Sequence, residues 1–115
     1  MANFEVARQD NAEVSVLQLT GYLDAHTAPE FEGALKKLMQ ESRFKIVVNL
    51  DRLQYISSAG LGVFMGFIEE IRQNSGDIKI SQVSQRVYKV FDLLGFPSLY
   101  EFYESADEAI GKFSL

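Results

Sequence analysis

The amino-acid sequence predicts an α/β fold: a mostly parallel central sheet, opened by an N-terminal hairpin, with about four helices. Three observations lead to this fold class. Segments of strand periodicity alternate with segments of helical periodicity after an initial hairpin. Capping-box patterns and glycine stops mark helix ends. The 115 residues, 47% hydrophobic and 23% charged, suit one ordinary globular domain spanning residues 1–115.

The first half of the chain predicts a hairpin, a helix and a buried strand. Residues 13–20 alternate as a strand does, residues 4–6 indicate a weaker strand before them, and turn-favouring residues 10–11 join the two. Residues 27–30 have the spacing of a capping box with proline in the first turn, so a helix begins there. Residues 44–50 are a short apolar run, typical of a strand covered on both faces, and we expect a short loop after it.

The second half continues the alternation. Apolar residues recur at helical spacing over residues 58–73, and residues 77–83 follow as a strand. A third helix ends at Gly95, and residues 100–103 form a short strand. Residues 105–108 are a second capping box, which opens a final helix.

Composition excludes several classes of function. The net charge is −5 with acidic and basic residues interspersed, so no basic stripe is present for nucleic acid. The chain has no cysteine, which excludes disulfides and thiolate chemistry. The first ten residues carry charges where a secretory signal is apolar, and no apolar run approaches the roughly 18–20 residues of a membrane span, so we expect a cytoplasmic protein. No metal-ligand cluster or cofactor motif is found, and neither is expected.

The segment 51–62 departs from local rules, because its helix begins with two glycines where alanine would stabilise it by about 0.5–1 kcal/mol each. Either another group must approach the backbone closely at Gly60 and Gly62, or these glycines let the helix pack tightly on the sheet. Ser57 and Ser58 lie at the positive end of this helix, where a phosphate would be stabilised. The alternative is that one serine only caps the helix.

Residues 55–62, together with residues 47–51 and 19–24 upstream, resemble the anti-sigma factor antagonists, which are bacterial single-domain members of the STAS family. This resemblance implies partner switching. The unphosphorylated antagonist would bind an anti-sigma factor that is also a serine kinase, and so free a sigma factor. Phosphorylation would end the binding, and a phosphoserine phosphatase would restore it.

The resemblance also implies roles for individual residues. By position, Ser58 corresponds to the phosphorylated serine, with Ser57 as second choice, and Asp24 and Asp51 match acidic positions near it. This sequence has Ser57 where the best-known antagonists carry aspartate, and Ala59 where they carry serine or threonine. The residues expected to flank the phosphosite or bind the partner are Asp24, His26, Asp51, Ser57, Ala59, Gly60, Leu61 and Gly62.

The docking face is expected around residues 24–26 and 57–64. Further along the helix, Phe64, Met65 and Phe67 belong to an apolar set that nearly surrounds it, so some of these side chains are candidates for exposure.

Catalysis is not expected. Asp24 and Asp51 have no accompanying catalytic motif, and His26, the only histidine, is expected to face solvent in the loop before the first helix. The helix start at residues 57–62 could cradle a phosphate, although it lacks the lysine of a P-loop. The alternative function is therefore a STAS-type nucleotide-binding or scaffold module in another signalling assembly.

Overall fold

The computed structural model describes residues 4–113, which form five strands, four α-helices and one 3₁₀ turn. The element order is the predicted alternation, with the 3₁₀ turn η1 as an addition. The elements are β1 (Phe4–Asn11), β2 (Val14–Leu23), α1 (Ala28–Gln40), β3 (Lys45–Ile56), α2 (Ser58–Gln73), β4 (Asp77–Ser81), α3 (Gln85–Leu93), η1 (Phe96–Ser98), β5 (Phe102–Tyr103) and α4 (Ala106–Phe113).

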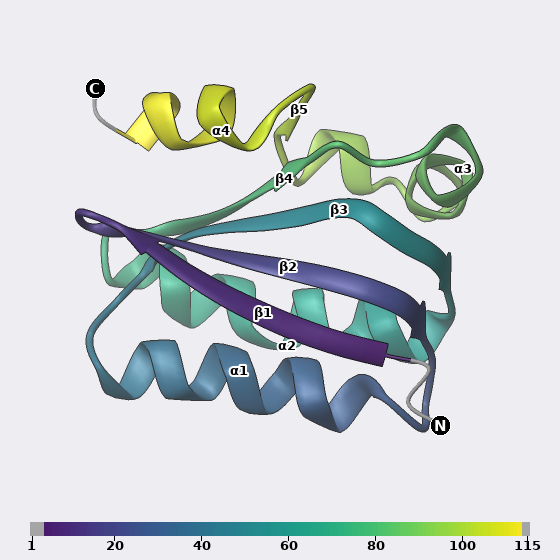
Figure 1. Cartoon of the computed structure of the whole chain (residues 1–115), viewed down its shortest axis with the longest axis horizontal. Helices are drawn as coiled ribbons and strands as arrows, with labels where there is room; N and C mark the ends of the chain where they lie inside the picture. The colour runs from purple at the N-terminus through teal and green to yellow at the C-terminus, as the bar shows by residue number, and fades with distance from the viewer. Residues whose placement is uncertain (1–3, 114–115) are drawn as a thin grey trace.

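The strands form one mixed sheet in the order β1-β2-β3-β4-β5. β1 pairs antiparallel with β2, and the other three pairings are parallel. Figure 1 shows α1 and α2 together on one face of this sheet and α4 on the other. The predicted fold class, a mostly parallel sheet opened by an N-terminal hairpin and carrying four helices, is confirmed.

The hairpin turn lies two residues later than the sequence suggested. Asn11 is the last residue of β1 and pairs with Val14, so the turn residues are Ala12 and Glu13. Ala12 adopts a left-handed conformation with φ 54°. Asp10 stays in the strand, where its carboxylate pairs with the Arg8 guanidinium at 2.9 Å.

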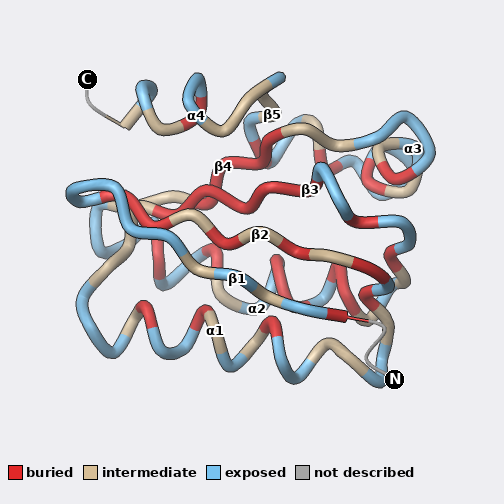
Figure 2. The backbone as a smooth tube through the Cα atoms, in the orientation of Figure 1, coloured by how far each residue is buried: buried red, intermediate tan, exposed pale blue. Residues whose placement is uncertain are grey.

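The main core lies between the sheet and the two helices α1 and α2. Figure 2 shows buried residues concentrated in β2, β3 and β4, whereas most of β1 is exposed. Phe64 of α2 is fully buried at the centre of an aromatic cluster. Its ring contacts four others edge to face, with centroids 5.0–6.4 Å apart: Phe31, Phe91, Phe96 and Tyr100.

β3 corrects the prediction of a strand at 44–50 followed by a loop, because it continues to Ile56. Its second half pairs with the end of β2, from Thr20 opposite Arg52 to Leu23 opposite Ile56, through two register shifts. These bulges change which residues alternate inward, so the simple strand pattern breaks after Leu50 although pairing continues.

The two predicted capping boxes have different outcomes. The Thr27 box is wrong, because the Thr27 hydroxyl donates to the Tyr22 carbonyl at 2.7 Å and gives α1 no side-chain cap. At α4, the Ser105 hydroxyl accepts from the Glu108 N–H at 3.0 Å, while the Glu108 carboxylate accepts from the Glu104 N–H. The cap by Ser105 is therefore confirmed, with the returning bond shifted by one residue.

The last strands are shorter than predicted. β4 ends at Ser81 instead of residue 83, and β5 contains only Phe102 and Tyr103 instead of residues 100–103. Tyr100 turns into the core, where its hydroxyl donates to the Phe64 carbonyl at 2.9 Å. Gly95 follows α3 in a left-handed conformation, with φ 75°, and ends this helical segment as expected.

Candidate functional site

The candidate site forms where β3 leads into α2. Ser57, the N-cap of α2, is extended with φ −105° and ψ 175°. Its N–H donates to the carbonyl of Leu23 at 2.9 Å. This bond fixes the start of α2 against the end of β2, so the loop from Asp24 to Thr27 lies beside the first turn of the helix.

The two serines at this junction have opposite environments. Ser58, the first residue of α2, is exposed. Ser57 is half-buried, and its hydroxyl oxygen is buried without a hydrogen-bond partner among the described residues. A modifying enzyme can therefore reach the hydroxyl-bearing residue Ser58, whereas the Ser57 hydroxyl is enclosed.

The first turn of α2 has no side-chain cap. Ser57 occupies the N-cap position, but its hydroxyl accepts no bond from the helix. The first N–H groups of an α-helix have no partner within the helix, and the helix dipole makes this end positive. An anionic group on Ser58 would therefore find hydrogen-bond donors and a favourable field.

The glycines of this segment do two different things. A Cβ atom on Gly60 would lie 2.7 Å from Leu23 Cγ and 3.0 Å from Ile56 Cγ1, so Gly60 is required for close packing of α2 on the strand ends. A Cβ on Gly62 would meet nothing within 4 Å, and Gly62 is exposed. Each of the two explanations offered for the glycines therefore suits one of them: tight packing explains Gly60, and only Gly62 leaves backbone open to another molecule.

The neighbouring residues of α2 are likewise divided between those that pack in the core and those that face solvent. Leu61 is buried in the core, and Ala59 is half-buried. On the next turns Phe64 is fully buried, Phe67 is half-buried, and Met65 is exposed. Of this apolar set, only Met65 presents a large side chain to solvent beside the first half of α2.

Asp24 has a structural role in the adjoining loop. Its Oδ1 accepts from the N–H of His26 at 2.9 Å and from the N–H of Thr27 at 3.2 Å. The half-buried carboxylate thus organises the turn before α1 and holds the loop beside Ser57. His26 is exposed, as the sequence predicted.

Asp51 lies within β3 and not in a loop after a shorter strand. β3 extends to Ile56, so the five strand residues 52–56 separate Asp51 from Ser57, and the six steps between them span at most about 20 Å at roughly 3.3 Å per residue. The exposed Asp51 lies within the first register shift between β2 and β3, and its N–H donates to the Asn49 side chain at 2.9 Å. Asp24 thus lies in the loop before α1 and Asp51 in β3, and the roles of both aspartates beside a phosphate on Ser58 stay predictions.

Two tyrosines that the sequence reasoning did not select belong to this region. Tyr22 and Tyr55 lie opposite each other at the ends of β2 and β3, with ring centroids 6.0 Å apart. Each is 47% exposed, as is Met65. One signal could have found them, since each tyrosine lies within a segment already quoted for the resemblance, 19–24 or 55–62, two residues before Asp24 or Ser57.

Other kinds of site find no support in the described part of the chain. Between residues 4 and 113, no group of three His, Asp or Glu side chains lies close enough to hold a metal ion. Over the same residues, no helix combines the length and apolar character needed to cross a bilayer.

Comparison with known proteins gives a consistent result. Residues 3–109 match the model of the STAS domain. An anti-sigma-B factor antagonist of Staphylococcus aureus is 32% identical over 105 residues, which cover 91% of this chain and 95% of that protein. The structure of an anti-sigma factor antagonist from Mycobacterium paratuberculosis superposes with a TM-score of 0.89 at 21% identity, covering 97% of this chain and 95% of the other. The Bacillus cell fate determinant SpoIIAA in its phosphorylated form has a TM-score of 0.73 at 24% identity, with 95% and 97% covered.

Proposed function

This chain belongs to the STAS domain family, and we propose that it is an anti-sigma factor antagonist, which binds an anti-sigma factor until Ser58 is phosphorylated. The observation that carries the proposal is the exposure of Ser58 at the first position of α2, next to a Ser57 hydroxyl that is enclosed. The S. aureus relative, an anti-sigma-B factor antagonist by name, supports the assignment of function.

The fold can accept a phosphate on Ser58 without rearrangement. Phosphoserine carries a charge of about −1.5 to −2 at neutral pH and three acceptor oxygens. These oxygens would lie beside the uncapped N–H groups of the first turn of α2, at the positive end of the helix dipole. The modification therefore changes the surface and leaves the core intact.

The same phosphate would oppose docking. The surface around Ser58 contains exposed apolar and aromatic side chains, Tyr22, Tyr55 and Met65, and the open backbone at Gly62. Burying a phosphate in such a contact costs desolvation energy, and the carboxylate of Asp24 adds repulsion. A loss of about 3 kcal/mol would weaken binding roughly a hundredfold.

The proposal also assigns roles to the partner proteins and to the residues that would contact them. The anti-sigma factor would also be the serine kinase that modifies Ser58, and a phosphoserine phosphatase would reverse the reaction in the cytoplasm. Residues 1–115 would act as one STAS-like domain that catalyses nothing itself. Asp24, His26 and residues 57–62 would form the contact, and Ser57, which replaces an aspartate of the best-known antagonists, would influence which kinase acts.

The first test is the affinity for the anti-sigma factor of the same organism, measured by calorimetry. We expect Ser58→Ala to bind like the wild type and Ser58→Glu to bind at least tenfold more weakly, because only the second variant adds charge at the helix start. Gln73→Glu, which adds one charge at the exposed far end of α2, is the matched control and should bind like the wild type. Equal affinities for all four proteins would remove the switch.

The second test is peptide mass spectrometry of the protein isolated from its native cells. Phosphate is expected on Ser58 and not on Ser57, since the Ser57 hydroxyl is enclosed. Phosphate on Ser57, or on neither serine under any growth condition, would contradict the assignment of the modified residue.

A further inference from the structure

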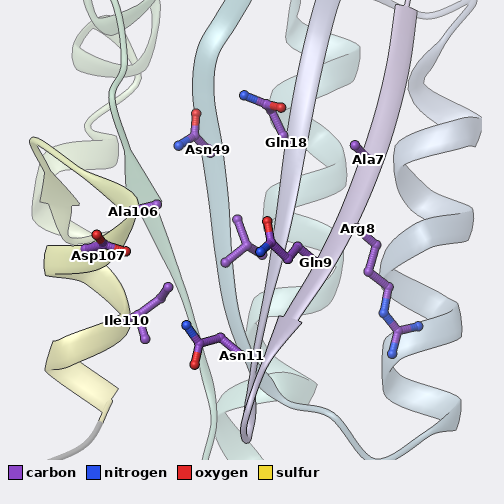
Figure 3. A pocket seen from close by; sticks show the side chains of 10 residues that line it. Ala7, Arg8, Gln9, Asn11, Gln18, Asn49, Ala106, Asp107 and Ile110 are labelled. Carbon is purple, nitrogen blue, oxygen red and sulfur yellow. The ribbon is translucent and has the colours of Figure 1, made fainter.

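The second face of the sheet is only partly covered, and a hollow of about 280 Å³ opens beside α4. α4 packs over the first residues of β2 and β3, and the hollow lies over β1, β2 and β3 next to it. Figure 3 shows side chains from both sides of this hollow: Gln9, Gln18 and Asn49 on three neighbouring strands, and Asp107 and Ile110 on α4.

Among the residues that line the hollow, Asn49 is held in place by hydrogen bonds. It belongs to a central strand and is only 6% exposed, and a carboxamide buried in this way must be hydrogen-bonded. Its Nδ2 donates to Gln82 Oε1 at 2.7 Å, and its Oδ1 accepts from the Asp51 N–H at 2.9 Å. A carboxamide has two N–H donors and two acceptor lone pairs, so one of each remains for a ligand.

Three further carboxamides, those of Gln18, Gln9 and Asn11, extend this polar surface. Gln18 pairs with Asn49 across β2 and β3, and Gln9 lies two residues along the neighbouring β1 from the partner of Gln18. Gln18 is half-buried and Gln9 is exposed, so both can offer donors and acceptors to a molecule in the hollow. Val16 and Ile110 supply an apolar surface between them.

The charges around the hollow disfavour an anion. Asp107 places a carboxylate beside it, whereas the guanidinium of Arg8, which also lines it, turns away toward α1 (Figure 3). That guanidinium is held by Asp10 at 2.9 Å and by Glu41 at 2.7 Å. Among residues 4–113, no aromatic side chain lines the hollow, so a planar base would find no ring there to stack on.

We infer that this hollow binds a small neutral polyol or sugar. Hydroxyl groups both donate and accept, which matches four carboxamides and one carboxylate, and the C–H groups of such a ligand can rest on Val16 and Ile110. The volume lies just below the roughly 300–1,000 Å³ of small-molecule pockets, so the ligand is of monosaccharide size. This inference is independent of the switch at Ser58.

The test is a titration of the full-length ¹⁵N-labelled protein, followed by NMR, with D-glucose, D-ribose and myo-inositol, each to about 50 mM because a Kd in the millimolar range is expected for so few hydrogen bonds. At least one of the three should shift the side-chain NH₂ signals of Gln9, Gln18 and Asn49 saturably. Glucose 6-phosphate should bind more weakly than glucose, because Asp107 repels its phosphate.

Substitutions then locate the site. Gln18→Leu, which keeps the size of the side chain, should weaken binding at least tenfold, and Gln73→Leu at the far end of α2 should not change it. If Gln18→Leu does not give the spectrum of a folded protein, Gln9→Leu on the exposed edge strand makes the same test. Absence of saturable shifts with all three probes would overturn the inference, as would unchanged binding in the folded variant or stronger binding of glucose 6-phosphate than of glucose.

Discussion

At the scale of single residues, Gly60 and Gly62 have different roles. The fold requires Gly60, whereas Gly62 is open to a partner. Gly60→Ala is expected to lower the free energy of unfolding by about 1–3 kcal/mol, because the added methyl group overlaps Leu23 and Ile56. Gly62→Ala has free space around it and is expected to raise stability by about 0.5–1 kcal/mol. Urea unfolding monitored by circular dichroism measures both.

The same pair tests the docking face. If a partner approaches the backbone at Gly62, Gly62→Ala will weaken binding of the anti-sigma factor while stabilising the free protein. Gly66→Ala, one turn further along the exposed side of α2 and equally free of neighbours, is the matched control for the change in helix propensity. Equal binding by both variants would show that Gly62 lies outside the contact.

The identity of the residues predicted part of the site, but it did not predict which of the selected side chains are buried and which are exposed. The motif selected Ser57 and Ser58 together, but only the fold shows that one hydroxyl is enclosed and the other residue exposed. Asp51 was selected by its place in the motif and expected after the strand, yet it lies within the bulged continuation of β3. A sequence pattern does not reveal where a strand ends when register shifts interrupt its alternation.

At the scale of elements, α2 and α3 both begin at a serine N-cap, yet only α3 uses it. The Ser84 hydroxyl accepts from the Val87 N–H at 3.2 Å, whereas the Ser57 hydroxyl is buried without a partner among the described residues. Ser84→Ala should therefore cost about 0.5–2 kcal/mol of stability. Ser57→Ala should be neutral or stabilising, because it removes a buried hydroxyl that has no compensating bond.

Chemical denaturation of both variants under one set of conditions makes this comparison. A loss in Ser57→Ala as large as that in Ser84→Ala would mean that the Ser57 hydroxyl is bonded in solution. In that case the contrast between the two adjacent serines, on which the choice of Ser58 partly depends, would lose its basis.

Helix and strand identity followed from periodicity almost throughout, and the exceptions have two causes. Thr27 has the spacing of a cap, but its hydroxyl bonds the Tyr22 carbonyl and so ties α1 to the end of β2. Tyr100 has strand propensity, but its ring joins the aromatic cluster around Phe64. At Thr27 a competing local hydrogen bond, five residues back along the chain, replaces the cap, whereas at Tyr100 a long-range contact overrides the strand preference and is not encoded in a short window of sequence.

At the scale of the whole molecule, one ion network ties the N-terminal hairpin to α1. Arg8 on β1 pairs with Asp10 on the same strand and with Glu41 at the end of α1. β1 is an edge strand of the sheet, and most of its residues are exposed. The network therefore contributes to holding β1 in place, to the modest extent that exposed ion pairs allow.

This network gives the protein a stability that should fall at acid pH. Hydrogen bonds from the Arg8 guanidinium lower the pKa of Asp10 from 3.8 to about 2 and also lower the pKa of Glu41. A carboxylate whose pKa is lowered by folding stabilises the protein above its unfolded pKa, and this contribution disappears as the pH falls through the folded pKa. The Tm should therefore decline between about pH 4.5 and pH 2. The Tm of Arg8→Gln should decline less steeply, lying below that of the wild type at pH 6 and close to it at pH 2.

Arg86→Gln, which removes an exposed arginine from α3, is the control and should follow the wild-type curve. Parallel curves for Arg8→Gln and the wild type would show that these carboxylates titrate alike in the folded and unfolded chain, and that packing alone holds β1 against α1.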